Sequence, residues 1–85
     1  SEMCIRDRNI EVDFYIPDAA MAIQVSYNPK KSTETWERES TALIKLSKVL
    51  DCKRLIILTY ELEEEIIVKD KKIEVIPVWK WLLDL

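Results

Sequence analysis

Apolar and polar residues alternate along two early segments of the chain, 9–16 and 21–27. A period of two is typical of a strand with one buried face. The expected inner faces are Ile10, Val12, Phe14 and Ile16, then Met21, Ile23, Val25 and Tyr27; the outer faces carry Glu11, Asp13 and Tyr15, then Ala22, Gln24 and Ser26. The short link Pro17–Ala20 has the composition of a turn, so the two strands are predicted to form an antiparallel hairpin.

A helical period follows. Apolar residues recur every three or four positions between Thr33 and Leu50, which predicts a helix over this range. Ser32 or Thr33 suits its N-cap, and Glu34 suits the positive end of the helix dipole. The expected buried stripe is Trp36, Leu43, Leu46, Val49 and Leu50.

The second half of the chain predicts a sheet that continues beyond this helix. Leu55–Leu58 is wholly apolar and indicates a central strand covered on both faces, parallel to the second strand after a right-handed crossover. Ile66–Val68 and Ile73–Ile76 flank the charged tip Lys69–Lys72 as a hairpin, and Pro77 precedes a closing helix. The predicted fold class is α/β, a small mixed sheet with elements in the order β-β-α-β-β-β-α.

The start of the chain does not match this pattern. Residues 1–8 have no clear period, and we expect them to be a non-native leader left by cloning or assembly. Residues 9–85 would then be a single domain. Because one long helix leaves a face of the sheet uncovered, we expect this domain to be truncated at its N-terminus.

Composition excludes several classes of site. The 85 residues include no histidine, which rules out catalysis by histidine, and no glycine, which rules out glycine-rich phosphate-binding loops. Thirteen basic against 16 acidic residues leave a net charge of −3, with no general attraction for nucleic acid. Cys4 and Cys52 are too few for a structural zinc site, and no apolar run is long enough to cross a membrane. We therefore expect a cytoplasmic protein without a membrane partner.

Polar residues of the first hairpin form the main candidate site. Alternation places Glu11 and Asp13 on the outer face of one strand and Gln24 and Ser26 on that of the next. Carboxylate and amide oxygens suit Mg²⁺, so Asp13, Glu11 and Gln24 are candidate metal ligands. The alternative is that these residues are the solvated face of an amphipathic hairpin. Trp79 and Trp81 are candidates for stacking on bases, or more simply for packing.

Five segments together resemble one known family. They are Glu11–Phe14 (EVDF), Ala22–Tyr27 (AIQVSY), Glu34–Glu39 (ETWERE), Ile57–Tyr60 (ILTY) and Ile76–Leu83 (IPVWKWLL). Their order and spacing are similar to those of the uncharacterised C-terminal domain of prokaryotic AAA-type ATPases. That domain has a restriction-endonuclease-like core, and the resemblance spans residues 9–85.

The resemblance implies a degenerate nuclease site. Such sites carry an aspartate on one strand and an acidic residue, any residue and a lysine on the next. Asp13 matches the aspartate, but Gln24 stands at the acidic position and Ser26 at the lysine position. Serine brings no positive charge to a phosphoryl transition state, and only Lys30 or Lys31 of the following loop is a candidate replacement.

Three hypotheses for the function follow. The first is a non-catalytic accessory module that contacts its own upstream ATPase domain, a nucleic acid or another protein, with no cofactor in this chain. The second is a Mg²⁺-dependent DNA nuclease with a substituted lysine. The third is an incomplete fragment that associates through exposed apolar surface.

Overall fold

The computed structural model describes residues 3–5, 10–26 and 33–84, with side chains for 10–26 and 37–84. The strands are β1 (Met3–Ile5), β2 (Val12–Ile16), β3 (Met21–Val25), β4 (Arg54–Thr59), β5 (Glu64–Val68) and β6 (Lys71–Pro77). The helices are the 3-10 turn η1 (Pro17–Ala19), α1 (Thr33–Val49) and α2 (Val78–Leu83).

The described strands form one mixed sheet in the order β1-β2-β3-β4-β6-β5. β2 pairs antiparallel with β3, and β5 with β6, which confirms both predicted hairpins. β3 and β4 are parallel, as the predicted crossover through α1 requires. The mixed α/β fold class is therefore confirmed.

The predicted element order was incomplete, however, because it lacked β1. This strand is too short to show a period in the sequence, yet it pairs antiparallel with β2. It also falls within the segment expected to be a leader; the origin of residues 1–8 stays a prediction.

The position of β6 is a further feature of the sheet. β6 lies between β4 and β5 and is parallel to β4. Its Ile73 and Val75 are fully buried, whereas Glu64 and Glu65 of β5 are exposed. The strand of the hairpin with fully buried residues thus occupies the interior of the sheet, and the strand whose residues are exposed or partly buried occupies the edge.

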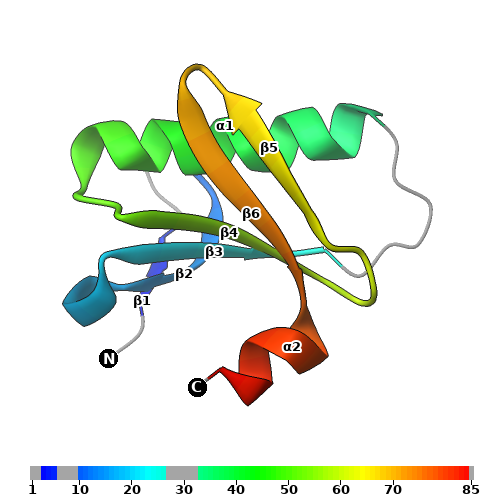
Figure 1. Ribbon diagram of the computed structural model, residues 1–85. Helices are drawn as coiled ribbons and strands as arrows, with labels where there is room; N and C mark the ends of the chain where they lie inside the picture. Colours follow the sequence, from blue (N-terminus) through cyan, green and yellow to red (C-terminus); the bar gives the residue numbers. More distant parts are fainter. Residues whose placement is uncertain (1–2, 6–9, 27–32, 85) are drawn as a thin grey trace.

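Helices cover both faces of the sheet (Figure 1). Leu43 and Leu46 of α1 pack with Leu55 and Ile57 of β4 on one face. On the other face, Ile56 and Leu58 of the same strand pack with residues that include Trp81 of α2. These contacts confirm that β4 is a central strand covered on both sides, and Trp81 packs rather than standing free.

The first strand departs from the predicted alternation. Val12 and Tyr15, three positions apart, both join the core beneath α1, whereas Phe14 is 38% exposed. The pairing of β1 with β2 changes register between Met3–Tyr15 and Ile5–Val12. An extra residue in β2, a β-bulge, accounts for the switch of face. The predicted grouping of Phe14 with Val12, and of Tyr15 with the polar residues, was therefore wrong.

Tyr15 also fastens β2 to the segment before β4. Its hydroxyl donates a hydrogen bond to the backbone carbonyl of Asp51, at 2.7 Å. Burial, with smaller effects from Cys52 and Asp51, raises the pKa of Tyr15. The hydroxyl is therefore held as a neutral donor.

The helix α1 matches its predicted range to within one residue. Leu43 and Leu46 are buried as expected, but Val49 is 53% exposed. The helix ends at Val49, and it is Leu50 that packs against the core. Trp36 and Tyr27 lie outside the residues whose side chains the structure describes.

An ion pair joins the start of β4 to β6. Nε and Nη2 of Arg54 donate to the two carboxylate oxygens of Glu74, each at 2.8 Å. The hydrogen bond from Arg54 lowers the pKa of Glu74, against the opposing effect of partial burial. Because the folded-state pKa is lowered, the pair stabilises the fold above pH 4.5, the ordinary value, and this contribution is lost as pH falls through the lowered pKa.

We expect Glu74→Gln to reduce the free energy of unfolding by about 0.5–1 kcal/mol at pH 7, since Arg54 is partly exposed to solvent. At pH 3 or below, the difference between variant and wild type should shrink. Urea unfolding at the two pH values measures this. A difference that is the same at both values would contradict the assignment of the stabilisation to the ionised pair.

Candidate functional site

The candidate site lies where the regular pairing of β2 with β3 ends. The regular pairing of these strands extends from Ile16–Met21 to Phe14–Ile23 and no further. Beyond it, side chains make the connections between the strands. The residues concerned are Glu11, Asp13 and Gln24, the three predicted metal ligands.

The Gln24 amide joins the two strands at this point. Its Nε2 donates to the backbone carbonyl of Glu11 at 2.8 Å, and its Oε1 accepts from the backbone N–H of Asp13 at 3.0 Å. The side chain thus bonds one backbone donor and one backbone acceptor of the β2 segment, beyond the last regular pair of β2 with β3, and it is 6% exposed. Gln24 is a cross-link between strands, and the prediction that it lies on a solvated outer face was wrong.

Asp13 connects the two strands in the opposite direction, from β2 to β3. Its Oδ2 accepts a hydrogen bond from the backbone N–H of Val25 at 2.8 Å. Asp13 is half-buried, and this hydrogen bond engages one of its carboxylate oxygens in holding β3. The structure brings Asp13 and Gln24 together, as the pattern from the sequence requires.

The other two predicted residues contribute differently. Glu11 is exposed, and its backbone carbonyl rather than its carboxylate contacts Gln24. Ser26 is 6% exposed, and its backbone N–H donates to the carbonyl of Leu58 at 2.8 Å, continuing the contact between β3 and β4. Lys30 and Lys31, the candidate replacements for the lysine, lie outside the described residues.

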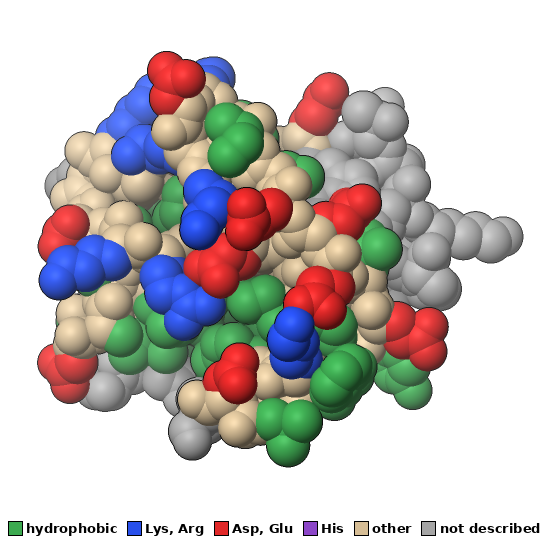
Figure 2. All heavy atoms as spheres, viewed as in Figure 1, with side chains coloured by type: hydrophobic (Ala, Val, Ile, Leu, Met, Phe, Trp, Pro, Cys, Tyr) green, Lys and Arg blue, Asp and Glu red, His purple; other side chains and the backbone are tan. Residues whose placement is uncertain are grey.

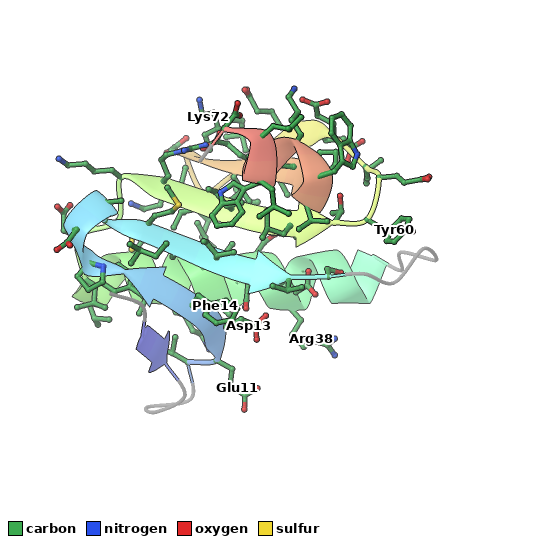
Figure 3. All side chains as sticks on the ribbon, turned by 90° about the horizontal axis from the view of Figure 1, so that it is seen from below. Glu11, Asp13, Phe14, Arg38, Tyr60 and Lys72 are labelled. Atoms are coloured by element: carbon green, nitrogen blue, oxygen red, sulfur yellow. The ribbon has the colours of Figure 1, made fainter. Side chains whose placement is uncertain are left out.

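An open hollow of about 740 Å³ lies beside these residues. Glu11, Asp13 and Gln24 line it from the sheet, and α1 lines the other side. The α1 residues that line it are Glu37, Arg38, Glu39, Thr41, Ala42 and Lys45. Figure 3 shows Glu11, Asp13 and Arg38 projecting toward the same side of the molecule from β2 and α1. Two cations, Arg38 and Lys45, therefore line the same hollow as the Asp13 carboxylate.

These cations were missed in the sequence. Arg38 and Lys45 are seven positions apart, two turns of helix, so they share one face of α1. The seven-residue spacing of these two cations, on the helix face beside the predicted buried stripe, is the sequence pattern that would have identified them.

The donor set does not form a ready metal site. Among the described residues, no group of three histidine, cysteine, aspartate or glutamate side chains is placed to hold a metal ion. Gln24 already uses both amide atoms in hydrogen bonds, and Mg²⁺ favours several oxygen ligands in octahedral geometry. A metal held by the Gln24 oxygen would have to share that oxygen with the backbone N–H of Asp13.

Within the described ranges, we find no helix with the length and apolar character needed to cross a membrane.

Comparisons with known proteins identify no relative of this chain. No protein-family description, curated protein or solved structure gives a match to this chain.

Proposed function

We propose that this chain is a non-catalytic accessory module, the nuclease-like C-terminal part of an AAA-type ATPase. The observation that carries this proposal is the use of Gln24. Where a nuclease of this class has a metal-binding carboxylate, this chain has an amide whose two ends hold β2 and β3 together.

The replacement of the acidic residue is chemically specific. A carboxylate at position 24 would lose the N–H that bonds the Glu11 carbonyl. One carboxylate oxygen would then face that carbonyl oxygen, and two acceptors would be in contact with no donor between them. Ser26, at the position of the lysine, is buried and carries no charge. Both substitutions favour a structural role for positions that are catalytic in active relatives of this type.

The surface around α2 supports a role in contacts with another protein or domain. Trp79, Leu82 and Leu83 are 56%, 56% and 78% exposed. Figure 2 shows apolar side chains gathered at the α2 end of this face, with charged side chains toward β5 and β6. Clustered apolar side chains on a surface mark an interaction site. The partner proposed is the upstream ATPase domain.

Comparing this chain with a longer protein that includes the upstream coding sequence tests the proposal. The longer protein should bind and hydrolyse ATP, and this chain alone should do neither. ATP hydrolysis by this chain, or an upstream sequence with no ATPase, would overturn it.

The second candidate is a Mg²⁺-dependent DNA nuclease with a substituted lysine. The observation in its favour is that Arg38 and Lys45 line the same hollow as Asp13. A cation there would stabilise the negative charge of a phosphoryl transition state in place of the lysine.

A cleavage assay separates the two functions. We expect wild type and Asp13→Ala to give the same background with Mg²⁺ or Mn²⁺ on single- and double-stranded DNA. Asp18→Ala, an exposed aspartate on η1, is the matched control. Cleavage by wild type and by Asp18→Ala that is lost in Asp13→Ala, with folding of all three verified by circular dichroism, would establish the nuclease instead.

A further inference from the structure

Strand β5 forms one edge of the described sheet, and its charges are separated along its length. It pairs with β6 on one side only. Glu63, Glu64 and Glu65 lie at its beginning, and Lys69 follows its end. Between them lies the apolar segment Ile66–Val68, in which Ile67 is 66% exposed.

The geometry of the hairpin determines which backbone groups face outward. Lys69 and Asp70, with φ of 50° and 64°, form a two-residue loop, and Val68 pairs with Lys71 across it. The pair that closes such a loop exchanges hydrogen bonds, and hydrogen-bonded pairs alternate along an antiparallel ladder. Ile66 and Val68 therefore bond to β6, while the N–H and C=O groups of Glu65 and Ile67 point to the free edge.

From this arrangement we propose that β5 is a self-complementary edge that pairs antiparallel with β5 of a second copy of this chain. The two-fold axis passes through Ile67, so that Ile67 meets Ile67 of the second copy. In this register Glu65 of each copy lies beside the end of the other copy's β5, where Lys69 begins the loop. This inference is independent of the proposed function.

The charge distribution selects a second copy as the occupant. Antiparallel pairing of any strand with itself brings its beginning against its end, and here acidic residues at the beginning meet a lysine at the end. Opposite charges and apolar side chains directly across from one another stabilise antiparallel pairs. A parallel arrangement would instead place Glu65 beside Glu65 and Lys69 beside Lys69.

The edge is also accessible. Glu65 and Ile67 of β5 are exposed, whereas Ile66 and Val68 are partly buried against the core beneath α1. Figure 1 shows β5 at the outside of the sheet, with α2 at the far end of β6. The interface is a short one, so we expect a weak dimer that forms reversibly with concentration.

Sedimentation velocity over a range of protein concentrations tests the dimer. Wild type should shift from monomer to dimer, and Ile67→Lys should remain monomeric because two ammonium groups would meet at the axis. Leu83→Lys, at an exposed apolar residue of α2, is the matched control and should dimerise like wild type. Monomer at every concentration in wild type, or a dimer lost in Leu83→Lys and kept in Ile67→Lys, would overturn the proposal.

Charge exchange tests the register. Glu65→Lys and Lys69→Glu should each weaken dimerisation about tenfold, since like charges then face each other at two places. An equimolar mixture of the two variants should form a heterodimer with restored affinity, and so should the double variant with itself. Glu65 also lies 4.0 Å from Lys72 of its own copy, and the double variant lacks that contact, so its recovery would report on pairing between copies alone. Failure of both to recover would exclude this register.

Discussion

Replacing Gln24 with glutamate is expected to lower the free energy of unfolding by about 2–3 kcal/mol at pH 7. The introduced carboxylate keeps the acceptor for the Asp13 N–H but loses the donor to the Glu11 carbonyl, at a position that is 6% exposed. It would also lie near the Asp13 carboxylate, which holds the same strand through Val25. Urea unfolding followed by circular dichroism measures the difference.

The loss should depend on pH. A protonated carboxyl at position 24 restores a donor, so the neutral form is favoured in the folded state and its pKa is raised there. A raised folded-state pKa gives stability that is complete below the unfolded-state pKa of about 4.3 and is lost as pH rises through the folded value. Gln24→Glu should therefore approach wild type near pH 4, after correction for the effect of pH on wild type.

Two measurements serve as controls for this prediction. Glu11→Gln changes an exposed side chain whose backbone carbonyl, not its carboxylate, bonds Gln24, so it should leave stability nearly unchanged. Mg²⁺ should not restore stability to Gln24→Glu. Recovery in millimolar Mg²⁺ would mean that the introduced carboxylate completes a metal site with Asp13, and would support the nuclease reading.

Ile57→Ala should be more destabilising, by about 2–5 kcal/mol. Ile57 is fully buried in the middle of β4, within the cluster that joins α1 to the sheet. A domain of this length has a total stability of roughly 4–13 kcal/mol. The cavity left by alanine would thus remove a large part of it, and the urea midpoint should fall accordingly.

Ile67→Ala is the matched control for this substitution. Ile67 is the same residue type in a strand but is 66% exposed, so its removal should change stability of the monomer by no more than about 0.5 kcal/mol. Both variants should be measured at low protein concentration. Similar losses in the two variants would show that burial of β4 is not what stabilises this fold.

The parts of the fold that were predictable depend on short-range patterns. The loop between β2 and β3, the charged tip of the β5–β6 hairpin and the helical period of α1 each involve neighbouring residues. The apolar run Leu55–Leu58 was enough to predict a strand covered on both faces, because few other environments accept four such residues in succession.

The site was less predictable because it depends on a register. Strict alternation placed Gln24 on a solvated face and Tyr15 with the polar residues. One additional residue in β2 moves Tyr15 to the face beneath α1, and nothing in the local sequence marks that residue. Gln24 in β3 keeps its predicted side of the strand, but that side is the one that α1 covers, so Gln24 is buried. The contact between Gln24 and Glu11 exists only once β2 and β3 are paired.

The central position of β4 has a consequence for how the chain folds. Both hairpins join strands that are adjacent in the sequence, and such units form within microseconds. β4 has no local partner: its Ile56 pairs with Ile23 on one side and Glu74 on the other. Pairings between distant residues carry the largest loss of chain entropy and slow the crossing of the barrier. We therefore expect the rate-limiting step to be the insertion of β4 between two hairpins that are already formed.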